Sequence, residues 1–337
     1  MAHPADGAEL LPVARALAAR GDWEGLRAWL EPAAASTGGG AEIVLLLAEA
    51  ELRLGDPARA RSRLDGAIPA LARLGDRPAQ RRALNLLGAA RFEVGELEGE
   101  EGAEEAFSRA LELANEDGDA LLVARATNNL GAIANIRGRR DAALAMYQLA
   151  VPAYQRIGSA VGLAECFHNM AITYRDARHV ELADECERRA IEFAREAGSA
   201  RLLAMARAGR AELSLLRGDA RLAHAGATLA AAEYGAIPDP VGEADALRLV
   251  GAALAALGER TEALDALERA VRQAHEHGSA LIEGEALLAR AALHLSTGER
   301  ESARVDAGGA HAIFTRLGAT AERQAVERLL ASLAIGE

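Results

Sequence analysis

The stretch that decides the fold is NNLGAIANIRGRRDAALAMYQLA, residues 128–150. Its apolar residues follow helical spacing on both sides of Gly138, which interrupts the pattern. A glycine just beyond the end of a helix readily takes the left-handed conformation that terminates it. The stretch therefore predicts two helices joined by a tight turn, with small residues at Gly131, Ala143 and Ala150.

Glycine recurs along the chain with a period of 40 residues. One series is Gly138, Gly218, Gly258 and Gly298, with Arg178 in the empty slot. A second is Gly118, Gly158, Gly198, Gly278 and Gly318, where Pro238 fills the gap. Gly55 and Gly95 continue the period upstream, and the 43 residues from Gly95 to Gly138 imply a three-residue insertion. Two series per period predict two helices per repeat.

Columns of small residues follow the same period. In the second helix one column is Ala60, Ala103, Ala143, Ala183, Ala223, Ala263 and Ala303. Seven residues further on, the next is Ala67, Ala110, Ala150, Ala190, Ala230, Ala270 and Ala310. The first helix has Ala48, Gly88, Gly131, Ala171, Ala211, Gly251 and Ala291. Small residues seven apart share one helix face and let a neighbouring helix approach closely.

This pattern resembles the tetratricopeptide repeat, with Leu130-Gly131 followed by Ala143, Tyr147 and Ala150 as its closest match. Leu87-Gly88 with Ala103, Phe107 and Ala110 is similar. The period of 40 rather than 34 resembles the longer-helix variant of kinesin light chains and bacterial regulatory proteins. The resemblance implies an all-α fold, a right-handed α-α superhelical solenoid of about eight helix pairs plus a C-terminal capping helix.

The repeats predict three segments. Residues 1–40 are an N-terminal cap or degraded repeat, with Leu26 in the first alanine column and Trp23 and Trp29 in its core. Residues 41–319 form seven repeats, and 320–337 a capping helix with a polar outer face. In the copy at 204–243, Arg207 and Arg210 occupy positions that are apolar in most copies. Either this first helix is rotated in register or it packs loosely.

Composition argues against several classes of function. The net charge of −12 disfavours nucleic-acid and anionic-membrane binding. All 38 basic residues are arginine, which excludes chemistry based on a Walker-A or Schiff-base lysine. His275-Glu276-His277 places two histidines on different sides of a helix, so we expect no metal site. We predict a non-catalytic protein without cofactors.

The cysteines and the N-terminus bear on location. The two cysteines, Cys166 and Cys186, are too few for a disulfide framework, and we interpret them as reduced core residues. The start, Met1-Ala2-His3-Pro4, lacks the pattern of a signal peptide, and no long apolar run predicts a membrane span. We therefore expect a cytoplasmic protein.

In the tetratricopeptide family, first-helix residues line the concave side and hold ligands. A stripe at positions −6, −3, −2, +1 and +4 from the Gly/Ala column is rich in Asn and Arg over residues 82–175 and mostly small or aliphatic over 205–295. Asn can donate to and accept from a peptide backbone, and Arg can grip a carboxylate. The predicted ligand residues are Arg82, Asn85, Arg125, Asn128, Asn129, Asn135, His168, Asn169 and Arg175. Alternatively, some of these Asn bridge neighbouring helices.

The sequence thus predicts a scaffold or adaptor that binds another protein or an extended peptide, with an acidic group of the ligand meeting the arginines. The alternative is a peptide-responsive regulatory receptor that switches a separate effector protein.

Overall fold

The computed structural model describes residues 10–37, 40–237 and 239–334, and this part of the chain is all helical. Pro238 and the ends of the two predicted caps lie outside it, as does the Met1–Pro4 start. The contacts divide the chain into two compact units, Met1–Ala126 and Thr127–Glu337. The boundary falls within α7, and each unit is described by itself.

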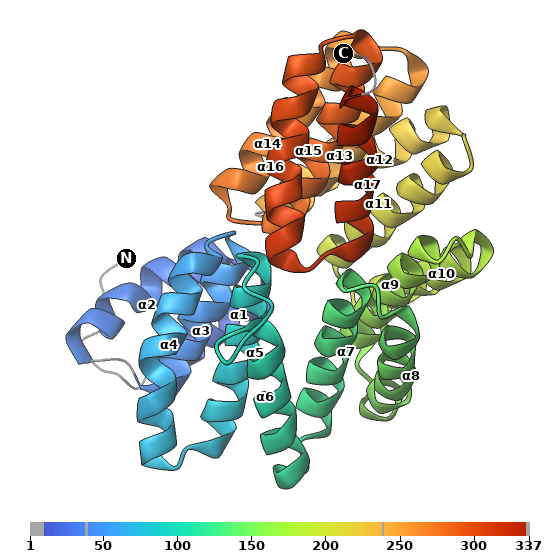
Figure 1. The fold of residues 1–337 in the computed structure, drawn as a ribbon. Coiled ribbons are helices and arrows are strands. Elements are labelled where there is room, and N and C mark those ends of the chain that lie inside the picture. The colour runs from blue at the N-terminus through green and yellow to red at the C-terminus, as the bar shows by residue number, and fades with distance from the viewer. Residues whose placement is uncertain (1–9, 38–39, 238, 335–337) are drawn as a thin grey trace. The chain divides into compact units, whose positions relative to one another are not determined.

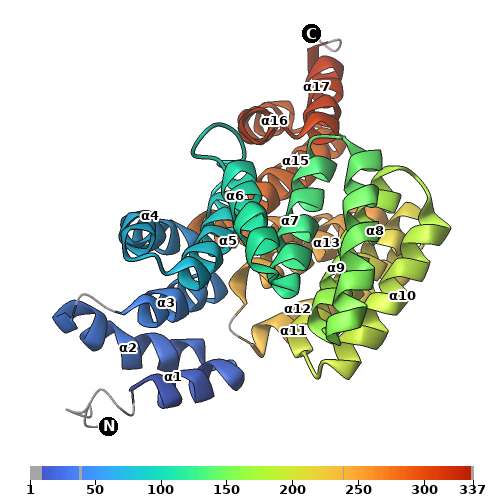
Figure 2. The same cartoon turned by 90° about the horizontal axis from the view of Figure 1, so that it is seen from below.

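Unit 1 consists of three helix pairs and the start of α7. Its helices are α1 (Leu10–Ala19), α2 (Trp23–Thr37), α3 (Ala41–Arg53), α4 (Pro57–Leu74), α5 (Arg77–Glu93) and α6 (Ala103–Asp117), followed by α7 (Ala120–Ile136). Figure 2 shows the pairs in order from α1 and α2 to α6.

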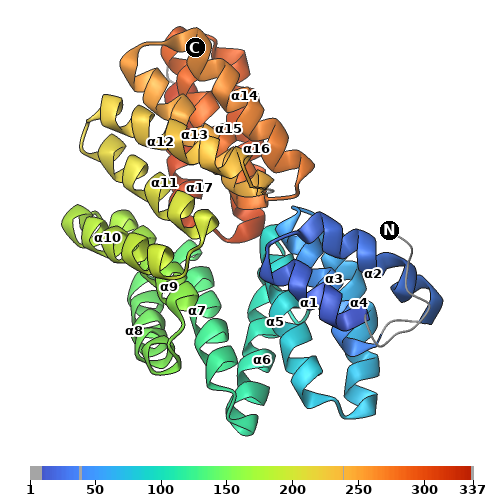
Figure 3. The ribbon, with the colours of Figure 1, turned by 180° about the vertical axis from the view of Figure 1, so that it is seen from behind.

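Unit 2 continues the same pattern, and its successive pairs can be followed in Figures 1 and 3. Its helices after α7 are α8 (Arg140–Ile157), α9 (Ala160–Asp176), α10 (Val180–Glu196), α11 (Ala200–Leu216), α12 (Ala220–Gly235), α13 (Pro240–Leu257), α14 (Arg260–Glu276), α15 (Ala280–Thr297), α16 (Arg300–Leu317) and α17 (Thr320–Ala334). Odd-numbered helices through α15 are called A helices, and even-numbered helices B helices. Within residues 10–37, 40–237 and 239–334, eight pairs and a final helix agree with the predicted number.

Tight turns separate the helices where the glycines predict them. Gly75 (φ 69°) and Gly158 (φ 72°) adopt the left-handed conformation at helix ends. The next residue caps the following helix: the Asp76 carboxylate accepts from the Ala79 amide, and the Ser159 hydroxyl from the Gly162 amide. Arg178, in the empty glycine slot, takes the same conformation at φ 64°, the only described non-glycine residue with a positive φ.

The small columns set how closely the helices pack. A Cβ atom built on Gly131 would lie 2.6 Å from the Tyr147 ring, and one on Gly88 2.6 Å from the Phe107 ring. These glycines therefore make room for a large B-helix side chain. The first alanine column is fully buried throughout. In the second, Ala67 is only partly buried, because the larger Ile68 beside it takes its place in the core.

The N-terminal pair shares a core with α3, which contributes Ile43, Leu46, Leu47 and Ala50. Leu10, Ala14, Leu26 and Leu30 are buried there, with Trp23 and Trp29 packed against them. The Trp29 Nε1 donates to the Leu10 carbonyl over 3.1 Å, so the indole is tied to α1. The tryptophans are core residues of this pair, as predicted. The division into a cap, seven repeats and a C-terminal helix stays a prediction.

Candidate functional site

Alternating charges connect four successive A helices of unit 2. Arg175 on α9 is ion-paired with Glu212 on α11. Arg248 on α13 lies 3.4 Å (Nη1 to Oε1) from Glu212 and 3.2 Å (Nε to Oε2) from Glu285 on α15. Asp176 and Asp245 pair with the arginine on their own helix, at 2.9 and 2.7 Å. We call this set the charge ladder: Arg175, Asp176, Glu212, Asp245, Arg248 and Glu285.

The ladder holds more carboxylates than guanidiniums. Burial raises the pKa of Glu285 to about 7, because Arg248 offsets the loss of water only in part and neighbouring carboxylates raise it further. At Glu212 burial also acts to raise the pKa, but Arg175 and Arg248 outweigh it and the pKa is lowered. The side chains of the ladder are 11–31% exposed, so their charges remain within reach of a ligand.

A buried histidine–glutamate pair lies next to the ladder. The His168 Nδ1 is 2.9 Å from the Glu187 Oε1, and the Glu187 side chain is 2% exposed. Burial raises the pKa of Glu187. At His168 burial acts to lower the pKa, but the charge and the hydrogen bond of Glu187 together outweigh it, so the pKa of His168 is raised too. A Cβ on Gly209 would lie 2.0 Å from the Glu187 Oε1, so this glycine makes room for the carboxylate. The other oxygen, Oε2, has no hydrogen bond within the described chain.

Three of the predicted asparagines bridge α7 and α9. The Asn169 Nδ2 donates to the Asn128 Oδ1 over 3.2 Å, and the Asn135 Nδ2 donates to the Asp176 Oδ2 over 3.0 Å. Asn128 is only 4% exposed. The bridging alternative therefore describes these contacts, and ligand binding by these amides stays a prediction. Asn129 is partly buried and has a partner within the chain.

In unit 1, the predicted arginines remain accessible. Arg82 on α5 and Arg125 at the start of α7 are exposed. The charge of Arg82 helps to lower the pKa of Glu42, which otherwise pairs with Arg15. Asn85 is partly buried and has a partner within the chain. Arg175 of unit 2 differs from the two exposed arginines, because carboxylates of its own chain already surround it.

Of the six ladder residues, only Arg175 was among the ligand residues predicted from the sequence. Glu212, Asp245, Arg248 and Glu285 all lie on the stripe over 205–295, which was described as mostly small or aliphatic. The signal was present as opposite charges about one period apart: Arg175 and Glu212 are separated by 37 residues, and Arg248 and Glu212 by 36. Glu187 was not on the stripe, since it comes from a B helix.

The remaining reactive groups are inert or unclustered. Cys166 and Cys186 are buried free thiols, and burial raises their pKa to about 12 and about 11. They are protonated at neutral pH and poor nucleophiles. Among the described residues, no group of three or more His, Cys, Asp or Glu could hold a metal ion. No described helix is both long and apolar enough to cross a membrane.

Comparison with known proteins gives one family-model match and several structures of similar fold. The family model for the tetratricopeptide repeat matches residues 122–196. No curated protein matches the chain by sequence. Three solved structures are similar in fold at low sequence identity.

A chain of the APC/C hetero-tetramer Cut9-Hcn1 aligns with 95% of this chain and 57% of its own length, with 14% identity and a TM-score of 0.62. A Rap protein complexed with Competence and Sporulation Factor aligns over 98% of this chain and 99% of its own, with 16% identity and a TM-score of 0.60. The tetratricopeptide-repeat sensor STAND protein PH0952 from Pyrococcus horikoshii aligns over 80% and 42%, with 15% identity and a TM-score of 0.51. This chain thus spans little more than half of the first of these.

The similarities confirm the predicted fold class, an all-α solenoid of tetratricopeptide-type helix pairs. Repeats of this type generally mediate binding between proteins. The tetratricopeptide-repeat model thus matches residues 122–196, and the solved structures share the fold over most of the chain.

Proposed function

We propose that this chain is a non-catalytic scaffold or adaptor that holds a segment of another protein against the A helices of unit 2. The observation that carries the proposal is the charge ladder, in which two guanidiniums face four partly exposed carboxylates. Burying charge without full compensation is costly, so such an arrangement is better explained by binding than by stability alone.

The surplus of carboxylates favours a basic group on the ligand. A lysine or arginine of the partner near Glu285 and Asp245 would supply the missing positive charge and lower the raised pKa of Glu285. Asn129, His168 and Asn169 lie on the same stripe and would meet the ligand backbone. An acidic group on a ligand would be met in unit 1, where Arg82 and Arg125 are exposed.

The test compares two neutralised variants in affinity capture from the source lysate. Glu285→Gln with Asp245→Asn removes the surplus charge while keeping side-chain shape. The control, Glu262→Gln with Asp265→Asn, alters two exposed acidic residues of the B helix α14. We expect a partner that is captured by wild type and control but at least tenfold less by the ladder variant. Equal capture by all three proteins would contradict the proposal.

The second step identifies the bound segment. Overlapping peptides from the captured partner are titrated against wild type, and each basic residue of the binding peptide is replaced by Gln. Loss of affinity at a single Lys or Arg would support the ladder as its site. An affinity that depends instead on acidic residues of the peptide, and on Arg82 or Arg125, would move the site to unit 1.

A peptide-responsive receptor is the second candidate. The ladder links α9, α11, α13 and α15, so a ligand that takes one carboxylate changes the pairing in the next repeat. The Rap structure with its bound factor, similar in fold over 98% of this chain, supports this alternative. We expect the binding peptide to change the radius of gyration in small-angle scattering. An unchanged radius of gyration at saturating peptide would contradict the receptor role and favour the scaffold role.

We also place the protein in the cytoplasm. Both cysteines are free, which fits a reducing compartment. Fractionation of source cells, with detection by an antibody, tests the location, and recovery outside the cytoplasmic fraction would contradict it.

A further inference from the structure

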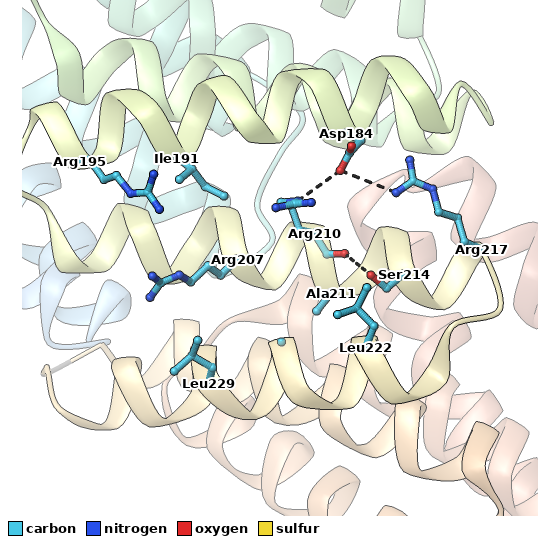
Figure 4. A pocket seen from close by; sticks show the side chains of 11 residues that line it. Asp184, Ile191, Arg195, Arg207, Arg210, Ala211, Ser214, Arg217, Leu222 and Leu229 are labelled. Carbon is cyan, nitrogen blue, oxygen red and sulfur yellow. Dashed lines mark hydrogen bonds and ion pairs between the residues drawn. The ribbon is translucent and has the colours of Figure 1, made fainter.

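A pocket of about 270 Å³ opens between α10, α11 and α12 in unit 2. Figure 4 shows arginines from α10 and α11 and leucines from α12 around it. Among the residues that line it are Asp184, Arg207, Arg210, Arg217, Leu222 and Leu229. None of them belongs to the charge ladder or to the predicted ligand residues.

The pocket exists because α11 departs from its own repeat. Arg207 and Arg210 stand where α13 carries Leu247 and Val250. Ala211 is nevertheless 3% exposed, like the rest of its column, so α11 keeps its register. Loose packing of α11, the other expectation from the sequence, stays a prediction. The long side chains border the space between the two B helices instead of filling it.

The charge around the pocket is unbalanced toward positive. Asp184 is the only acidic residue in the lining, and it is shared among guanidiniums at long distances. Its carboxylate lies 3.3 Å from Arg210, 3.8 Å from Arg217 and 3.7 Å from Arg188. Arg207 is paired with Glu233 of α12, and Arg195 is exposed. On a chain of net charge −12, this pocket is a local surplus of guanidinium groups.

The opposite wall of the pocket is apolar and open. Leu222 is 59% exposed and Leu229 50% exposed, on one face of α12. Seven residues of helix place them roughly 10.5 Å apart, which is two turns of any helix laid alongside. Ile191 of α10 is buried at the base. Two exposed leucines on one helix face, beside several guanidinium groups, form the kind of surface patch that marks an interaction site.

We propose that this pocket docks an amphipathic helix of a partner protein that carries leucine-type side chains two turns apart and carboxylates beside them. The leucines would pack on Leu222 and Leu229, and the carboxylates would complete the pairing of Arg210 and Arg217. Glu212 and Arg210 are two residues apart on α11 and point in different directions, so this site is separate from the ladder. The chain then has two independent docking surfaces.

The test selects ligands instead of assuming one. A phage library of 18-residue helical peptides, with Leu, Ala, Glu, Gln and Lys randomised on the surface, is panned on the full chain. Before each round the library is depleted on the double variant Arg210→Glu, Arg217→Glu. Enriched peptides are then labelled with fluorescein and titrated by anisotropy.

Three variants locate the binding. They are the charge-reversed pair Arg210→Glu, Arg217→Glu, the apolar pair Leu222→Ser, Leu229→Ser, and the control pair Arg269→Glu, Arg272→Glu on the exposed surface of α14. Circular dichroism confirms that all are equally helical. We expect enriched peptides with Leu and Glu at helical spacing, at least tenfold weaker binding to either pocket variant, and unchanged binding to the control.

Several outcomes would overturn the proposal. One is a selection that enriches no peptide over the depleted background. Another is a set of peptides without acidic residues, or peptides that bind the pocket variants as tightly as wild type. Competition by millimolar inorganic phosphate, with no effect of the leucine changes, would identify a phosphate site in place of a helix-docking site.

Discussion

Helix α11 contributes to two charged regions that differ in exposure, in pairing distance and in the sign of their excess charge. On one side Glu212 lies between Arg175 and Arg248 in the ladder, largely buried and paired at close range. On another, Arg210 and Arg217 share a single carboxylate at 3.3 and 3.8 Å and stay 48% and 43% exposed. The ladder has surplus carboxylates and the pocket surplus guanidiniums.

The difference teaches that charge count alone does not describe a binding surface. In the ladder, low exposure strengthens each pairing and makes loss of one partner expensive. At the pocket, solvent screens the charges, so they cost little and contribute little to stability. We therefore expect ladder substitutions to change stability as well as binding, and pocket substitutions to change mainly binding.

The largest expected effect comes from removing a ladder cation. Arg248→Met leaves Glu212, Asp245 and Glu285 without their shared partner, and we expect a loss of about 3–5 kcal/mol in the free energy of unfolding. Arg217→Met at the pocket should cost no more than about 0.5 kcal/mol. Urea unfolding followed by circular dichroism measures both. Equal losses would remove the distinction between the two regions.

The second prediction concerns pH. The raised pKa of Glu285, about 7 against 4.5 when unfolded, means that the folded state binds more protons between these values. Stability contributed by this group is present below pH 4.5 and is lost as the pH rises through 7. His168 and Glu187, whose pKa values are also raised, act in the same direction.

Glu285→Gln should therefore stabilise the protein at pH 8 by on the order of 1 kcal/mol and change little at pH 5. Urea midpoints measured across this range test it. A variant whose midpoint follows the wild-type pH profile in parallel would show that Glu285 does not titrate as its surroundings indicate.

A smaller effect is expected from restoring the apolar column of α11. Arg210→Leu replaces a 48% exposed guanidinium with the type of residue that other A helices carry here. We expect a gain of about 0.5 kcal/mol in stability and at least tenfold weaker binding of the selected acidic peptides. Thermal unfolding and anisotropy give the two values. Unchanged peptide affinity would show that Arg210 makes no contact with the ligand.

The smallest effect is expected at Asp184. Asp184→Asn removes the shared carboxylate and should change stability by less than about 0.5 kcal/mol, since its ion pairs are long and partly exposed. Acidic peptides should bind a few-fold more tightly, and the increase should shrink at high salt. Weaker binding would mean that Asp184 positions the arginines and does not compete with the ligand.

The fold could be predicted from sequence because close helix contacts demand small residues. Gly131 against Tyr147 and Gly88 against Phe107 show why the columns hold. Arg178 occupies a glycine position of the repeat and adopts the same left-handed conformation. The period is therefore a better guide to the backbone conformation than the residue type is. Ala67 shows the limit, since its larger neighbour Ile68 replaced it in the core.

The site was less predictable, because pairing depends on which residues meet across helices. The stripe placed Asn128 and Asn169 on one face. It did not predict that these two side chains, 41 residues apart, would form a hydrogen bond with each other. Whether a side chain faces a ligand or its neighbour is decided by distances between helices. Glu187 reaches His168 from a column that holds Tyr147 and Leu267 in other repeats, which no stripe of A-helix residues could include.

The close fit of Gly131 to Tyr147 also limits how this chain can be recombined. Ala211 holds the position of Gly131 on the A helix α11. If α11 replaced α7 beside α8, the Ala211 Cβ would lie about where a Cβ on Gly131 would, 2.6 Å from the Tyr147 ring, which is too close. An A helix and its own B helix are thus matched parts. A duplication, deletion or transplantation whose breakpoint divides this pair should therefore fail. The heritable module of this protein is the hairpin, and a single helix is only half of it.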